Sequence, residues 1–217
     1  MRTEVLPDVR GLPSGGQVQS KLQYPNTKMK IIHISDTHGR HHQLNDLPEA
    51  DVIVHSGDIS HNGTESEVLD FLNWYIGLPY PHKIFVTGNH DLCLWDAEFI
   101  EDLPTNVHFL QDCGCEIGGV KFFGLAYNHP EELIPDDTDI VVTHEPPVMI
   151  LDKSAGTHWG NAPLRNRVTE IKPRYHLFGH AHESFGTLKE YRTIFSNASL
   201  LNERNRMVRK PRLFLLE

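Results

Sequence analysis

Short apolar runs rich in β-branched and aromatic residues recur along the chain. From residue 30 onward these runs are 30–35, 51–56, 83–87, 120–126, 139–143, 175–178, 191–196 and 212–216. Runs of this length and composition, bounded by polar and turn-forming residues, are typical of β-strands. The pattern therefore predicts a protein that is rich in strands.

Three other segments carry helical signals: 64–76, 96–102 and roughly 161–171. In the first, Thr64 is a candidate N-cap, acidic residues follow it, and apolar residues form a broad stripe. The early strands alternate with helical segments, whereas the later strands mostly follow one another. This order predicts an α/β sandwich with helices on the outside.

The N-terminal part of the chain differs from the rest. Residues 1–28 contain several prolines and glycines without periodicity, which predicts an irregular leader before a single domain over 29–217. No apolar run approaches the roughly 20 residues of a membrane span. An apolar signal-peptide region is also missing, and the 3 cysteines are too few for a disulfide framework. We therefore expect a cytoplasmic protein without a membrane partner.

Residues that can bind metal follow five of the predicted strands. In chain order they are Asp36 and His38, Asp58, Asn89 with His90 and Asp91, His144 with Glu145, and His180 and His182. Ligands of α/β proteins bind at the carboxyl ends of the strands, so these scattered residues are expected to meet at one site. Histidine, the commonest metal ligand, is also frequent, with 15 in 217 residues.

The donor types narrow the identity of the metal. Counted over Asp36, His38, Asp58, Asn89, His144, His180 and His182, the donors are two carboxylates, an amide oxygen and four imidazoles, with no thiolate. Such a set favours Mn²⁺, Fe, Zn²⁺ or Ni²⁺ over Ca²⁺ or a structural zinc. Seven ligands are too many for one catalytic ion that keeps an open position, and they fit two ions that share a carboxylate. The sequence therefore predicts two divalent transition-metal ions, with Mn²⁺ favoured.

The order of these motifs, "DTH … GD … GNHD … H … GHAH", resembles the signature of the calcineurin-like metallophosphoesterase superfamily from about residue 29 to residue 200. The segments "ISDTHGR", "TDIVVTHEPP" and "HLFGHAHESFG" are similar to the small metallophosphoesterase-domain (MPPED-like) phosphodiesterases. The resemblance implies a four-layer αββα sandwich of mixed β-sheets flanked by helices. It also implies hydrolysis of small phosphodiesters, with cyclic nucleotides among the candidate substrates.

The same resemblance implies a role for each residue. One metal would be held by Asp36, His38, Asp58 and His182, and the other by Asp58, Asn89, His144 and His180. A hydroxide between the two ions would attack the phosphorus, His90 would be the general acid, and Asp91 would orient its ring. Arg40 matches the family pattern "DTHxR" and is a candidate phosphate contact. His61 and His129 lie in segments that could line the pocket.

The remaining histidines have structural interpretations. His33, His55 and His176 lie inside predicted strands and are expected to be buried. Five others are expected to be exposed to solvent or to lie in loops: His41, His42, His82, His108 and His158.

Charge and motif details separate the alternative functions. The net charge of −9 and isoelectric point near 5.9 argue against extended nucleic-acid binding, and hence against a nuclease, but not against a small phosphate ester. A phosphoprotein phosphatase would resemble "GDxxDRG", whereas "GDISHNG" lacks the arginine. A non-catalytic scaffold would be expected to have lost ligands, and none is missing. The physiological substrate and the oligomeric state stay open.

Overall fold

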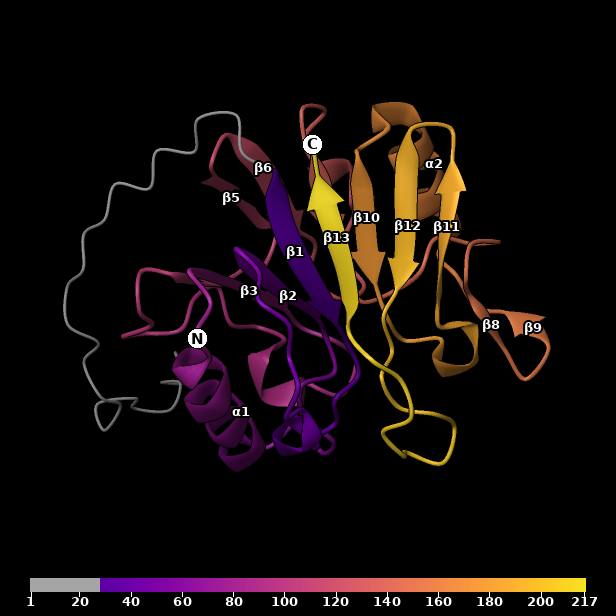
Figure 1. Cartoon of the computed structure of the whole chain (residues 1–217). Helices are drawn as coiled ribbons and strands as arrows, with labels where there is room; N and C mark the ends of the chain where they lie inside the picture. The colour runs from indigo at the N-terminus through magenta and orange to yellow at the C-terminus, as the bar shows by residue number, and fades with distance from the viewer. Residues whose placement is uncertain (1–27) are drawn as a thin grey trace.

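The computed structural model describes residues 28–217, and its strands form two large sheets (Figure 1). The first sheet has the order β13-β1-β2-β3-β4. Its strands are β1 (Met29–Ile34), β2 (Val52–Ser56), β3 (His82–Val86), β4 (Val107–Phe109) and β13 (Arg212–Leu216). β1 to β4 pair in parallel, and β13 joins β1 in the antiparallel direction.

The second sheet has six strands in the order β11-β12-β10-β7-β6-β5. They are β5 (Cys113–Ile117), β6 (Val120–Gly124), β7 (Ile140–Val142), β10 (Tyr175–Phe178), β11 (Gly186–Glu190) and β12 (Thr193–Asn197). The four inner strands are parallel, whereas both edge strands are antiparallel. A small hairpin of β8 (Lys153–Ser154) and β9 (Thr157–His158) stands apart.

The two sheets pack face to face, and a helix covers the outer face of each. α1 (Glu65–Gly77) packs against Ile32, Ile53 and Phe85 of the first sheet. α2 (Ala162–Ile171) packs against Val141 and Phe178 of the second sheet. Figure 1 shows the two helices beside different sheets.

The apolar layer between the sheets includes Ile31 and Val54 from the first sheet and Phe122, Val142 and Leu177 from the second. Neighbouring residues along a strand point to opposite faces, so each inner strand supplies one layer on either side. This arrangement confirms the predicted αββα sandwich of mixed sheets flanked by helices.

The predicted start of the first helix is confirmed by its capping box. The Thr64 hydroxyl accepts the backbone N–H of Glu67 at 3.3 Å, and the Glu67 carboxylate accepts the N–H of Thr64 at 3.2 Å. These bonds satisfy donors that the first turn of a helix leaves free.

The predicted helix over 96–102 is wrong. The chain there forms turns after the 3₁₀ turn η2 (Leu92–Leu94), and Asp102 adopts a positive φ of 59°. A helix of seven residues is marginal on its own, and here Ala97 and Ile100 reach the core from an irregular segment instead. The other 3₁₀ turns are η1 (His41–Gln43), η3 (Glu131–Leu133) and η4 (His182–Ser184).

Two further expectations concern the N-terminus and membranes. The predicted leader, residues 1–28, lies outside the described residues except for Lys28. Within residues 28–217, neither helix has the length and apolar character needed to cross a bilayer.

Candidate metal centre

The seven predicted ligands lie together where strands of both sheets end. Asp36, Asp58 and Asn89 follow strands of the first sheet, whereas His144 and His180 follow strands of the second. His38 and His182 lie two residues beyond Asp36 and His180, in the same loops. The parallel directions of β1, β2, β3, β7 and β10 bring these ends to one edge, as the sequence pattern predicted.

Distances between the side chains link the seven residues into one cluster. Asp58 Oδ2 lies 3.4 Å from His38 Nε2 and 3.3 Å from His144 Nε2. Asp36 Oδ1 lies 3.2 Å from His182 Nε2. The Asn89 oxygen completes the set, at 3.0 Å from His144 Nε2 and 2.9 Å from His180 Nδ1.

The backbone of this cluster is unusual. Four of the seven residues adopt positive φ angles that non-glycine residues rarely use: Asp36 at 55°, His38 at 42°, Asp58 at 55° and His180 at 67°. Such conformations cost free energy and persist where the surrounding structure enforces them, commonly at functional sites. Here they turn the chain sharply after each strand, so that the side chains face one another.

Two motif glycines allow the loops to approach closely. A Cβ atom on Gly88 would lie 2.2 Å from Asp58 Oδ1, and one on Gly179 would lie 2.2 Å from Asp36 Oδ2. Either contact would push away a carboxylate that the cluster needs. The glycines in "GNHD" and "GHAH" therefore make room for the acidic residues of other loops.

Backbone carbonyls orient three of the four imidazoles. Nδ1 donates to a carbonyl oxygen in His38 (Ser60, 3.2 Å), His144 (Ser56, 2.9 Å) and His182 (Asn202, 3.3 Å). This fixes the proton on Nδ1 and leaves the Nε2 lone pair facing the cluster. Outer hydrogen bonds of this kind are typical of histidines that bind metal.

The electrostatics of the cluster favour positive charge at its centre. Burial lowers the pKa of His144, but the Asp58 carboxylate outweighs burial and, with Asp36, raises this pKa to about 10. Burial raises the pKa of Asp58, and the neighbouring His144 imidazole reverses this, so the net direction is downward. Burial also raises the pKa of Asp36, but the His182 hydrogen bond and the nearby imidazoles of His144, His182 and His38 together lower it.

The donor set fits divalent ions. Ligand atoms about 2.1 Å from a tetrahedral ion lie about 3.4 Å apart, close to the nitrogen–oxygen separations at Asp58 and Asp36. In the neutral ring, the Nε2 lone pair of His144 faces Asp58, Asn89 and His180 at 3.0–3.3 Å. A cation among these atoms, whether the proton on His144 or a metal ion in its place, offsets the negative charge of Asp58 and Asp36.

His90 lies at the rim of the cluster and belongs to neither predicted ligand set. Its backbone N–H donates to Asp58 Oδ1 at 2.9 Å, and its Nδ1 donates to the carbonyl of His61 at 2.8 Å. The ring is 4.7 Å from the His38 ring. The second nitrogen, Nε2, is therefore the one that is left for proton transfer.

The expectation that Asp91 orients the His90 ring is wrong. The buried Asp91 carboxylate accepts the backbone N–H groups of Gly88 at 2.8 Å and Ser60 at 2.9 Å, and the Ser60 hydroxyl at 2.7 Å. An acidic residue after a histidine can turn inward and bind its own loop, which spacing alone does not reveal. Asp91 joins the loops after β2 and β3, and the His61 carbonyl positions the ring.

The three candidate substrate contacts lie in different places. His61 is exposed next to the cluster, and its ring stacks 5.9 Å from that of His90. Arg40 is exposed just after His38, and its side chain makes no hydrogen bond or ion pair with the described residues. His129 pairs with Asp112, and it has no hydrogen bond or ring contact with the cluster among the described residues. A substrate role for any of them stays a prediction.

One residue that supports the centre was missed by sequence reasoning. The hydroxyl of Ser199, two residues beyond β12, donates to Asp36 Oδ2 at 2.8 Å. The available signal was "FSNAS", residues 195–199, which runs over the end of the predicted strand 191–196. A serine after a strand is too common to indicate such a contact on its own.

The structural interpretation of the remaining histidines holds only in part. The expectation of loop or solvent positions is wrong for His82, His108 and His158, which lie half-buried in β3, β4 and β9. His33, His55 and His176 are fully buried and each bonds a serine or threonine hydroxyl at 2.9 Å. His41, which was expected in a solvated loop, is fully buried instead. It packs between Phe71 and Trp74 of α1, because η1 folds back onto that helix.

Comparison with known proteins places the chain in a family. A family model of calcineurin-like phosphoesterases matches residues 29–184, which include all seven residues of the cluster. The chain belongs to the calcineurin-like phosphoesterase family. It is therefore a metal-dependent phosphoesterase, a hydrolase of phosphoric esters.

Individual relatives agree with this assignment. UPF0046 protein K07C11.7 of Caenorhabditis elegans is 34% identical, over 93% of this chain and 80% of the relative. Metallophosphoesterase domain-containing protein 1 of Homo sapiens is 31% identical, over 84% of this chain and 69% of the relative. One crystal structure, 15% identical, has a TM-score of 0.60 and covers 88% of this chain and 100% of its own. That last likeness concerns the fold alone.

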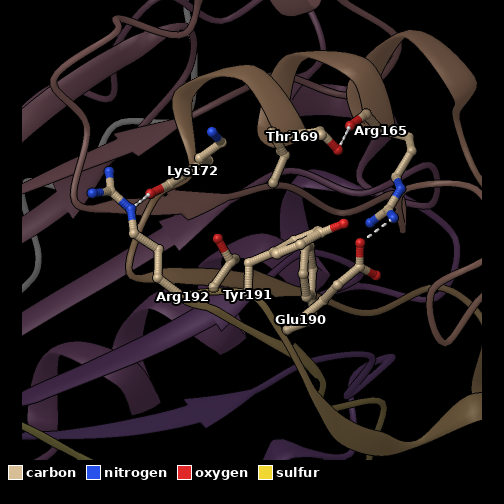
Figure 2. Close-up of a pocket in the computed structure, with 9 residues that line it drawn as sticks. Arg165, Thr169, Lys172, Glu190, Tyr191 and Arg192 are labelled. Atoms are coloured by element: carbon tan, nitrogen blue, oxygen red, sulfur yellow. Dashed lines mark hydrogen bonds and ion pairs between the residues drawn. The ribbon is translucent and has the colours of Figure 1, made fainter.

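A hollow of about 470 Å³ lies elsewhere, between α2 and the β11–β12 hairpin (Figure 2). Figure 2 shows Arg165 paired with Glu190, and Arg192 donating to the Lys172 carbonyl at the end of α2. These cations are used to hold the helix against the hairpin. The hollow includes none of the cluster residues and is not part of the metal centre.

Proposed function

We propose that the chain hydrolyses small phosphodiesters, cyclic nucleotides among them, at a centre of two divalent transition-metal ions with Mn²⁺ favoured. Asp36, His38, Asp58 and His182 would hold one ion, and Asp58, Asn89, His144 and His180 the other. The observation that carries the proposal is the convergence of all seven side chains, with His90 beside them and free of a ligand role.

When bound, the ions would polarise the phosphoryl oxygens and lower the pKa of a coordinated water. The protein supplies the proton for the leaving group. The His61 carbonyl accepts from Nδ1 of His90 and fixes the orientation of the ring, which leaves Nε2 to donate to an ester oxygen at the rim. The bond from the His90 N–H to Asp58 ties this donor to the proposed bridging carboxylate.

The loop after β2 favours diesters over phosphomonoesters. In "GDISHNG", Asn62 stands where the phosphoprotein phosphatase pattern has its arginine. The Asn62 side chain donates to Glu67 at 3.2 Å, on the side of α1, and not to the cluster. The loop therefore offers no guanidinium to grip the extra charge of a monoester. The acidic chain, with net charge −9, also disfavours long nucleic acids.

The test compares the rates at which several phosphate esters are hydrolysed. The protein is first loaded with Mn²⁺, and its metal content is measured. We expect hydrolysis of bis-p-nitrophenyl phosphate and of 2′,3′-cyclic nucleotides to exceed that of p-nitrophenyl phosphate by at least about tenfold. Preference for the monoester would indicate a phosphatase, and efficient digestion of single-stranded or duplex DNA would indicate a nuclease. Absence of any turnover with two ions bound would contradict the proposal.

A further inference from the structure

A second group of metal-binding side chains lies between η1 and α1. It consists of His41 and His42 from η1 and Asp70 from α1, whose potential ligand atoms all lie within 4.8 Å of one another. Asp70 Oδ2 is 3.2 Å from His41 Nε2, and Asp70 Oδ1 is 3.2 Å from His42 Nε2. None of the three belongs to the ligand sets of the main centre.

His41 is the unusual member of the group. Its side chain has no solvent exposure, yet neither ring nitrogen has a hydrogen bond with any described residue. Nε2 is near Asp70, but not in hydrogen-bonding geometry. A buried polar atom without a partner destabilises the fold, so such atoms are rare unless something else satisfies them.

The surroundings of His41 keep its ring in the form that binds metal. The rings of Phe71 and Trp74 lie 5.6 and 5.0 Å away and shield it from water. Burial, followed by the nearby His42, lowers the pKa of His41 to about 4. The imidazole is therefore neutral at pH 7, with a lone pair available to an ion.

We infer that His41, His42 and Asp70 form a third metal site, which binds Zn²⁺ or a similar divalent transition-metal ion with water as a further ligand. Two imidazoles and a carboxylate suit borderline ions such as Zn²⁺, Ni²⁺ and Co²⁺, and they suit Ca²⁺ and Mg²⁺ poorly. The separations of 3.2 Å are close to the value of about 3.4 Å expected around a tetrahedral ion.

The competing interpretation is an ion pair between His42 and Asp70 alone. Both residues are more than half exposed, so a pair of this kind adds little to stability. It also leaves both nitrogens of His41 unsatisfied. A shared ion satisfies Nε2 of His41 and explains why Asp70 is directed at both rings.

An ion at this site would join η1 to α1. η1 begins three residues after His38, a residue of the main centre with a positive φ of 42°. Binding would therefore restrain the segment that carries His38, and we expect it to raise the unfolding temperature independently of phosphoesterase activity.

The experiment counts ions. Full-length protein is equilibrated with excess Zn²⁺, desalted, and examined by native mass spectrometry and elemental analysis. We compare wild type with Asp70→Asn and His42→Ala, and use Glu65→Gln as a control that removes an exposed charge from the same helix. We expect three Zn²⁺ per chain in wild type and Glu65→Gln, and two in each site variant.

A calorimetric titration with Zn²⁺ gives a second measurement. In Asp70→Asn, one of the three binding phases should lose at least roughly 100-fold in affinity, and the corresponding gain in unfolding temperature should be lost with it. Equal Zn²⁺ content in Asp70→Asn and Glu65→Gln would overturn the inference, whatever the number of ions in the main centre. Neither measurement depends on turnover, so failure of the phosphodiesterase proposal would not affect them.

Discussion

Asp58 is the residue on which both halves of the proposed centre depend. One of its oxygens faces His38 and His144, and the other accepts the N–H of His90. Its backbone is held at a positive φ of 55°, and Gly88 leaves room for the carboxylate. A single side chain thus joins the proposed ligands of each ion to the proposed proton donor.

Replacement of Asp58 by asparagine should therefore reduce metal content and activity together. The amide keeps the size of the side chain but loses the charge that a shared ligand supplies to two cations. We expect elemental analysis to find one ion or fewer in the main centre, and turnover of bis-p-nitrophenyl phosphate to fall at least about 100-fold. A variant that retains both ions and full turnover would rule out the bridging role.

His90 should behave differently, because it touches the cluster without being one of its proposed ligands. His90→Ala should keep its metal and lose about 10²- to 10⁴-fold in rate on substrates with poor leaving groups, such as cyclic nucleotides. The loss on bis-p-nitrophenyl phosphate should be much smaller, since p-nitrophenolate leaves without a proton. His61→Ala keeps the carbonyl that holds His90, so it tests separately the neighbouring ring, which is itself a candidate substrate contact. Equal losses on both substrates would argue against a proton donor.

At the scale of elements, the start of α1 positions more than the helix itself. The Glu67 carboxylate accepts the backbone N–H groups of Asn62 at 3.0 Å and Thr64 at 3.2 Å, and the Asn62 side chain at 3.2 Å. The same loop presents the His61 carbonyl to His90. One capping residue therefore orders the segment between β2 and α1.

Glu67→Ala should lower the free energy of unfolding by about 1–2 kcal/mol, because it removes a cap and leaves loop donors without an acceptor. Urea titration of the variant beside Glu65→Gln gives the comparison. The control neutralises a neighbouring exposed charge and should change stability by less than about 0.5 kcal/mol. If the two variants unfold at the same urea concentration, the loop does not depend on Glu67.

The elements also mark what can be predicted from sequence. Apolar inner strands and the capped α1 were found because each has a strong local pattern. The segment 96–102 was misassigned, since its few apolar residues reach the core without a helix. β5 and β11 were missed because they are edge strands whose residues are mostly exposed. Their sequences therefore lack the alternation of apolar and polar residues by which a half-buried strand is predicted. The ligands followed from strand ends, whereas the inward turn of Asp91 depends on loop geometry that no motif encodes.

At the scale of the whole molecule, the metal centre spans both sheets. Asp36, Asp58 and Asn89 come from the first sheet, and His144 and His180 come from the second. Ions bound there would connect the two halves of the sandwich at the edge where the apolar layer ends. They would also create a local positive site in a chain of net charge −9, which would attract the small anionic ester of the proposed reaction to this point and not to the surface at large.

The interior contributes a pH dependence that is separate from the metal. Burial lowers the pKa of His176 to about 3, and burial likewise lowers that of His55 to about 3. In the unfolded chain both titrate near pH 6.5, so below that pH the unfolded state binds protons that the folded state does not. The stability that the neutral rings contribute is complete above pH 6.5 and is lost as the pH falls toward 3.

Each of these histidines should therefore add about 1.4 kcal/mol per pH unit to the acid dependence of unfolding in this window. His176→Phe tests one of them, because phenylalanine keeps a ring beside Phe178 and Phe195 and cannot take a proton. The substitution removes the bond between His176 and the Thr143 hydroxyl, but this hydroxyl still donates to the Glu145 carbonyl. The free energy of unfolding is measured by urea titration between pH 4 and 6, with metal removed by a chelator. Its dependence on pH should be shallower in the variant, by the equivalent of about one proton. The titrating residues of the metal centre are common to both proteins and cancel in the difference. An unchanged slope would mean that His176 is not held neutral by its burial.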